Sequence, residues 1–159
     1  MSRRILLVDD EPAILLTMKT ILEMNGYEVV TAASAADAKF QLEADSYHLV
    51  ITDLTMENET SGFDVVRFAK ERQYRPAAAI LTAHAFLGSE WKAKGADRLF
   101  IKPANMPELL KGIEALLAGQ QITERRDKKT SIAEGVQLPE ATATELAGRR
   151  PAPSEKANT

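Results

Sequence analysis

The chain has 159 residues, a net charge of −3 at pH 7 and no cysteine. This length suffices for one folded domain with a sizeable core. The weak negative charge argues against general binding to nucleic acid or acidic membrane surfaces, and the lack of cysteine excludes disulfides, thiolate metal sites and cysteine nucleophiles. The first apolar run, Ile5–Val8, is too short for a signal peptide or a membrane span. We therefore expect a cytoplasmic protein without membrane association.

Short aliphatic runs recur along the first three-quarters of the chain. They lie at Ile5–Val8, Glu28–Thr31, Leu49–Thr52, Ala78–Leu81 and Leu99–Ile101. Apolar runs without alternation are typical of parallel strands that are covered on both faces. These runs therefore predict five strands of one parallel sheet.

Helix-length stretches with apolar residues three and four positions apart separate these runs. The first carries a stripe formed by Ile14, Met18, Ile21 and Leu22. Gly26 is predicted to end this helix and Gly95 a later one. The other helices are predicted over 35–44, 63–71, 87–94 and 107–117. The alternation predicts an α/β domain over residues 1–119, with a doubly wound five-stranded parallel sheet flanked by five helices.

Residues 120–159 differ in composition from the rest of the chain. The segment is polar and becomes rich in Ala, Thr, Pro and Glu, which predicts a disordered tail without a folded output domain. Its basic cluster consists of Arg125, Arg126, Lys128 and Lys129. The interspersed acids Glu124 and Asp127 favour a solvated linker over contact with nucleic acid.

Polar side chains follow four of the predicted strands. Asp9 and Asp10 follow the first, Asp53 the third, Thr82 and Ala83 the fourth, and Lys102 the fifth. Parallel strands that share a sheet bring their carboxyl ends to one edge, so we expect these residues to meet in one crevice. Each has a structural explanation when taken alone, because acids at a strand end often cap the next helix.

The chemistry follows from the combination of these residues. Clustered carboxylates repel one another, and a divalent cation such as Mg²⁺ relieves that repulsion. With Lys102 nearby, the site also suits a phosphoryl group. Attack of a carboxylate on phosphorus would form an acyl phosphate, with the cation and the lysine offsetting negative charge.

The pattern resembles the receiver domain of two-component response regulators over about residues 3–118. The matching pieces are Ile5–Asp10, Leu49–Asp53, Ile80–Ala83, Gly95–Asp97 and Ile101–Pro103. The resemblance implies a flavodoxin-like fold with strand order 2-1-3-4-5.

The resemblance also implies roles for individual residues. Asp53 would be the phospho-acceptor, and Asp10, Asp53 and the Thr55 carbonyl would ligate Mg²⁺, with Asp9 acting through water. Thr82 would turn toward the phosphoryl group, Ala83 would leave it room and Lys102 would pair with its oxygens. The Lys102–Pro103 bond would be cis.

The function implied is a phosphorylation-dependent switch, not a turnover enzyme. A histidine kinase or phosphotransfer protein would supply the phosphoryl group. A downstream protein would bind the helix 4, strand 5 and helix 5 face, about 87–117, which also suits a homodimer; direct nucleic-acid binding is not expected.

An aspartyl-phosphate phosphatase is disfavoured because Thr55 stands where such enzymes place a second acid. A receiver-like interaction module that is never phosphorylated is the other alternative.

Three positions depart from the family pattern. Leu99 stands where an aromatic switch residue is usual, and either a core role or a switching role is consistent with leucine. Glu57 replaces a usual proline in a loop that reaches Gly62 one residue late. This acid either changes partner choice or phosphoryl lifetime, or belongs to a neutral insertion. Ala104 replaces a common aromatic after Lys102-Pro103.

Overall fold

The computed structural model describes residues 2–83, 88–102 and 105–119. These residues lie within one compact unit, Met1–Gln120. The predictions for the tail (120–159), for the Lys102–Pro103 bond and for Ala104 lie outside the described residues. No helix among the described residues is long and apolar enough to cross a membrane.

The centre of the domain is a parallel sheet. Its strands are β1 (Arg4–Val8), β2 (Glu28–Ala32), β3 (Leu49–Asp53), β4 (Ala77–Thr82) and β5 (Arg98–Ile101). They pair in the order β2-β1-β3-β4-β5, all parallel. The predicted sheet and strand order are thus confirmed, with strand ends shifted by a residue or less.

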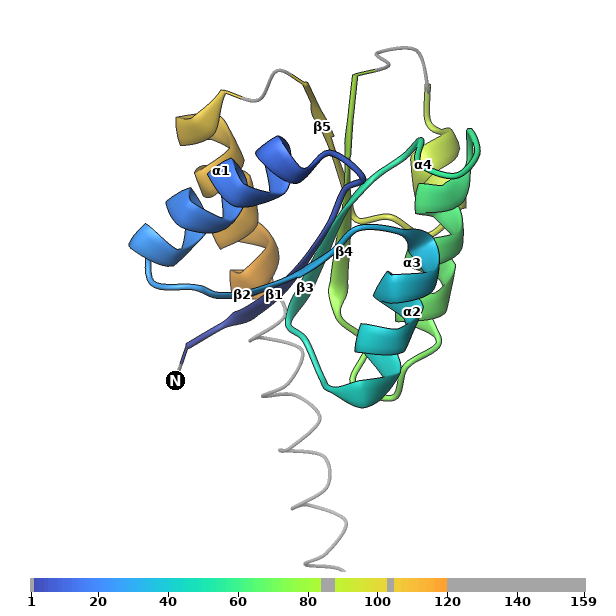
Figure 1. Cartoon of the computed structure of the whole chain (residues 1–159), viewed down its shortest axis with the longest axis horizontal. Helices are drawn as coiled ribbons and strands as arrows, with labels where there is room; N and C mark the ends of the chain where they lie inside the picture. Colours follow the sequence, from blue (N-terminus) through green and yellow to red (C-terminus); the bar gives the residue numbers. More distant parts are fainter. Residues whose placement is uncertain (1, 84–87, 103–104, 120–159) are drawn as a thin grey trace, which may run out of the picture. The chain divides into compact units, whose positions relative to one another are not determined.

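Helices cover both faces of the sheet. They are α1 (Pro12–Met24), α2 (Ala35–Ala44), α3 (Ser61–Lys70), α4 (Glu90–Ala93) and a final helix over 106–119. Figure 1 shows α1 and the final helix on one face, with α2, α3 and α4 on the other. Such two-sided cover explains why the strands show no polar alternation.

Two layers of apolar side chains hold the helices to the sheet. On one face, Leu7 and Ile51 pack with Leu22 of α1 and Ile113 of the final helix. On the other, Val50 packs with residues of α2 and α3. Most of these side chains are fully buried, and each contributes roughly 1.5–3 kcal/mol to folding.

The helix ends follow the predicted glycine signals with one correction. Gly26 has φ 91°, and the Tyr27 N–H reaches back to the Leu22 carbonyl, so α1 ends at a left-handed glycine as predicted. The end of α4 is similar, because Gly95 has φ 99° and the Ala96 N–H donates to the Trp91 carbonyl. The helix predicted over 87–94 is wrong in length, because the described helix covers only Glu90–Ala93 and begins after Gly88. Residues 84–87 lie outside the described part of the chain.

Candidate functional site

Strand register places the predicted site residues at one edge of the sheet. Val8 pairs with Thr52, so Asp9 and Asp53 are the next residues on neighbouring strands. On the far side of β3, Asp53 pairs with Leu81, and Thr82 is one step beyond. Thr82 pairs with Ile101, which brings Lys102 to the same edge. The sheet therefore brings together residues separated by up to 93 positions.

Lys102 links two of the carboxylates. Its Nζ lies 2.8 Å from Asp9 Oδ2 and 3.5 Å from Asp53 Oδ1. The side chain of Asp9 is 2% exposed and that of Asp53 is 12% exposed. Asp9 Oδ1 accepts a second hydrogen bond from the Glu11 N–H at 2.9 Å. Asp9 is thus a buried acid with partners for both oxygens, which such an acid requires.

Burial and charge shift the ionisation of this cluster. Burial raises the pKa of Asp53, and the Asp9 charge adds to the increase while Lys102 opposes it. Burial alone would lower the pKa of Lys102, but its hydrogen bond to Asp9 and the two carboxylate charges raise it. The ammonium of Lys102 therefore stays charged, whereas the folded state disfavours the ionised form of Asp53.

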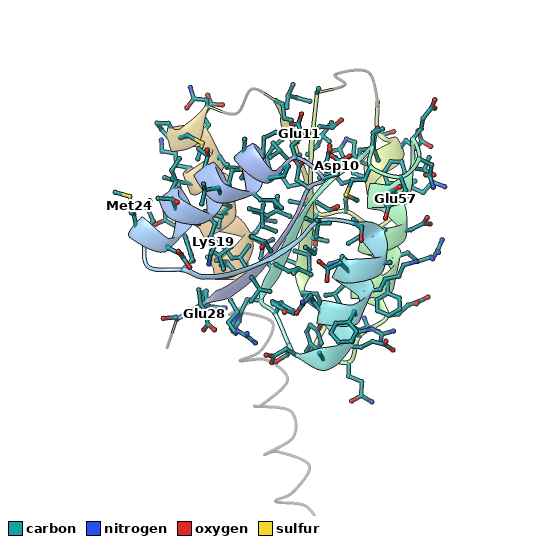
Figure 2. The ribbon with its side chains drawn as sticks, viewed as in Figure 1. Asp10, Glu11, Lys19, Met24, Glu28 and Glu57 are labelled. Atoms are coloured by element: carbon teal, nitrogen blue, oxygen red, sulfur yellow. The ribbon has the colours of Figure 1, made fainter. Side chains whose placement is uncertain are left out.

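The acidic residues fit a divalent cation. Asp9, Asp10 and Asp53 can each offer an oxygen such that all three atoms lie within 4.8 Å of one another. Asp10 is exposed at the edge of the domain (Figure 2). Within the described residues the Thr55 carbonyl accepts no hydrogen bond, so its lone pairs are available. Carboxylates with one carbonyl and retained waters are a set that Mg²⁺ favours.

The remaining predicted residues lie at the same edge. Thr82 is 1% exposed, and its carbonyl accepts the Lys102 N–H at 2.7 Å. Ala83 is exposed and lines, with Lys102, a hollow of about 490 Å³ bounded by α1. A small residue at Ala83 leaves this side of the site open.

The loop after Asp53 is held closely to α3. The Gly62 N–H donates to the Leu54 carbonyl at 2.8 Å. A side-chain carbon at Gly62 would collide with the Asp53 carbonyl and the Leu54 backbone. Only glycine permits this close approach, which explains the residue.

Three further residues have contacts that the sequence could not show. Leu99 is half-buried and packs with Trp91 against the cluster on the α3 side, whereas its neighbour Phe100 is buried on the opposite face. His48 Nδ1 accepts the Arg4 N–H at 2.9 Å, which is a structural role. Glu57 accepts a hydrogen bond from Ala35 N at the start of α2. No local sequence signal predicts that long-range contact.

We expect Asp53→Asn to stabilise the cation-free protein. The raised pKa of Asp53 means that the folded state disfavours the ionised carboxylate, so ionisation costs stability above the folded pKa. Thermal unfolding in EDTA at pH 7 should show a Tm higher by a few degrees. At a pH below the ordinary aspartate range both states bind the proton, and the difference should vanish. A lower Tm at pH 7 would contradict this assignment.

A doubly wound parallel sheet with clustered acids and a lysine at its carboxyl edge defines a flavodoxin-like α/β protein with a site suited to a divalent cation. The profile of the response regulator receiver domain matches residues 5–114. The chain belongs to this family, which serves two-component signalling. The predicted family and fold are both confirmed.

Curated relatives are longer regulators. The chain is 36% identical over 124 residues to the alginate biosynthesis transcriptional regulatory protein AlgB of Pseudomonas aeruginosa, covering 77% of this chain and 27% of AlgB. It is 28% identical over 127 residues to the alkaline phosphatase synthesis transcriptional regulatory protein PhoP of Bacillus subtilis, covering 77% of this chain and 51% of PhoP. The chain thus spans about a quarter to a half of these relatives.

Solved structures agree with the fold. A CheY-like receiver domain protein from Methanospirillum hungatei has a TM-score of 0.72 at 30% identity, covering 77% of this chain and 99% of that one. The response regulator TrrA from Thermotoga maritima, solved in complex with Mg²⁺-BeF, has a TM-score of 0.65 at 31% identity. That match covers 72% of this chain and 98% of TrrA.

Proposed function

We propose that this chain is a switch that accepts a phosphoryl group on Asp53, with Mg²⁺ held by Asp10, Asp53 and the Thr55 carbonyl. The observation that carries the proposal is the edge cluster, in which Lys102 lies 3.5 Å from Asp53 and three carboxylates converge within 4.8 Å. Such a cluster disfavours folding through repulsion, so a ligand that neutralises it is the best explanation. The Mg²⁺-BeF complex of TrrA supports the same kind of ligand here.

The proposed reaction is a phosphoryl transfer onto the protein itself. An Asp53 carboxylate oxygen forms a bond to phosphorus while the bond from phosphorus to the donor's leaving atom breaks. Bound Mg²⁺ supplies positive charge that offsets the charge of the phosphoryl oxygens. Lys102 lies close enough to Asp53 Oδ1 to pair with one of those oxygens, and Asp9 holds the lysine in place. Thr82 follows Leu81, the residue that pairs with Asp53 on β3, and its hydroxyl would donate to the phosphoryl group.

The donor and the downstream partner are proposed by class. A histidine kinase or phosphotransfer protein would donate, as for response regulators in general. The output surface would be the face formed by α4, β5 and the final helix, where Ile101 is 41% exposed. A hollow of about 290 Å³ lies between β5 and the final helix and is lined in part by Arg98, Asn105 and Glu108. This mixed polar and apolar surface suits a protein partner, including a second copy of the chain.

Intact-mass measurement tests the proposal directly. Incubation of the full chain with Mg²⁺ and acetyl phosphate should add one phosphoryl mass to the wild type and none to Asp53→Asn. Omission of Mg²⁺ should reduce the adduct by at least about tenfold, because the transfer depends on charge stabilisation.

The control addresses short-lived adducts. Beryllofluoride with Mg²⁺ gives a stable mimic of the phosphorylated state, and its binding should raise the Tm of the wild type and not that of Asp53→Asn. If neither an adduct nor beryllofluoride binding occurs, the better hypothesis is that the chain is an interaction module that is never phosphorylated.

A further inference from the structure

We propose that Glu57 is a positioning residue for the cation site, because it ties the loop after Asp53 to the N-terminus of α2. The inference rests on the proposed function and deepens it. Glu57 does not itself bind the cation. Its effect would pass through the backbone to the Thr55 carbonyl, two residues earlier in the same loop.

The contact is specific and long-range. Glu57 Oε2 accepts the Ala35 N–H at 2.8 Å across 22 positions of sequence. Ala35 is the first residue of α2, and its N–H has no partner within the helix. The carboxylate also lies at the positive end of the helix dipole. Figure 2 shows Glu57 at the same edge of the domain as Asp10.

Among the residues that the structure describes, this hydrogen bond is the one polar anchor between the loop and α2. The other hydrogen bonds of the loop run within it or toward α3: Asn58 N donates to Ser61 Oγ at 3.0 Å, and Gly62 N donates to the Leu54 carbonyl. Among the described residues, no second hydrogen bond joins the loop to α2. Met56 packs against the apolar cluster beneath, but apolar packing has little directionality.

Thr55 therefore lies between an anchor on the α3 side and an anchor on the α2 side. A carbonyl ligand must be held to about 0.5 Å for productive binding. Residues that orient metal ligands commonly change affinity by about 10–100-fold when they are removed. Glu57 is exposed, so the lower end of that range applies.

The experiment is Mg²⁺ titration of the full chain by calorimetry at fixed ionic strength. Glu57→Ala removes the acceptor, and Glu57→Gln keeps an acceptor oxygen without the charge. Ala35→Pro removes the donor. Proline is tolerated at the first helical position, and the extended backbone of Ser34 (φ −159°, ψ 166°) suits a residue before proline. Glu59→Ala is the matched control, since Glu59 is an exposed acid of the same loop with no hydrogen bond among the described residues.

We expect Glu57→Ala and Ala35→Pro each to weaken Mg²⁺ binding by about tenfold, with no further loss in the double variant. Glu57→Gln and Glu59→Ala should bind within about twofold of the wild type. The proposal is overturned if Glu57→Ala binds normally. It is equally overturned if Glu57→Gln and Glu59→Ala are as weak as Glu57→Ala, because charge alone would then act.

The outcomes separate this inference from the proposed function. If the wild type binds no Mg²⁺, both fall together. If the wild type binds Mg²⁺ and Glu57→Ala matches it, only the role of Glu57 fails. Thermal unfolding of each variant in EDTA checks that weaker binding reflects the site, since a merely structural change would lower the Tm and leave the affinity of the folded protein intact.

Discussion

Replacing Lys102 by methionine should destabilise the cation-free protein by about 3 kcal/mol, because it leaves the buried Asp9 carboxylate without its counter-charge. The side chain of Asp9 is 2% exposed and accepts the Lys102 hydrogen bond at 2.8 Å. Asp53 would lose its nearby cation as well. Urea unfolding in EDTA at pH 7 measures the effect. Saturating Mg²⁺ should recover part of the loss, because a cation bound to the folded state replaces the missing charge.

Lys19→Met provides the matched control. Lys19 pairs with Glu23 at 2.7 Å, but the two side chains are 38% and 46% exposed. A surface pair of this kind contributes about 0–1 kcal/mol. If Lys102→Met lowers the free energy of unfolding no more than Lys19→Met does, water must reach the Asp9 carboxylate.

The sign of the pH effect follows from the raised pKa of Lys102. A base with a raised pKa gives stability that is complete below its unfolded pKa and declines as the pH rises through its folded pKa. On the alkaline side, the difference between the wild type and Lys102→Met should therefore shrink only when the pH is strongly alkaline, and on the acid side it should shrink as the carboxylates bind protons.

Gly62→Ala is expected to have the second large effect, on stability and on cation binding together. The added carbon would meet the Asp53 carbonyl and the Leu54 Cα, which are backbone atoms that cannot rotate away. Forced overpacking of this kind costs about 1–3 kcal/mol. The shift would also displace the acceptor and the Thr55 carbonyl, so Mg²⁺ affinity should fall by at least about tenfold. Urea unfolding and calorimetry measure the two effects.

Gly119→Ala is the control for this substitution. A side-chain carbon there meets nothing within 4 Å. Alanine favours a helix over glycine by up to about 1 kcal/mol, so this variant should be neutral or slightly more stable. If Gly62→Ala behaves like Gly119→Ala, the loop after Asp53 can relax without loss.

The fold was predictable because its signals are local. Unbroken runs such as Leu49–Thr52 match parallel strands, and Gly26 stops α1 where the left-handed backbone requires it. The helix over 87–94 was predicted too long, because helical periodicity alone does not reveal that the backbone of Gly88 has a positive φ of 52°. Apolar periodicity identifies a buried face more reliably than a helix start.

The sequence by itself determined which residue types meet at the sheet edge. Asp9 and Lys102 directly follow strands and Asp53 ends one, and parallel strands align their carboxyl ends. Only the tertiary structure decided how these residues share their charge. Asp9 takes the hydrogen bond of Lys102, while Asp53 is left with the longer contact and a raised pKa.

The same division applies to Glu57 and Leu99. From the sequence, Glu57 is consistent with a functional acid or with a neutral insertion, and Leu99 is consistent with a core role or a switching role. The tertiary structure placed Glu57 against the first N–H of α2 and Leu99 against the apolar cluster on the α3 side. Such contacts join segments that are distant in the chain, and they depend on how the helices pack on the sheet. Local sequence therefore determines the elements and the order of the site residues, whereas packing decides which atoms touch.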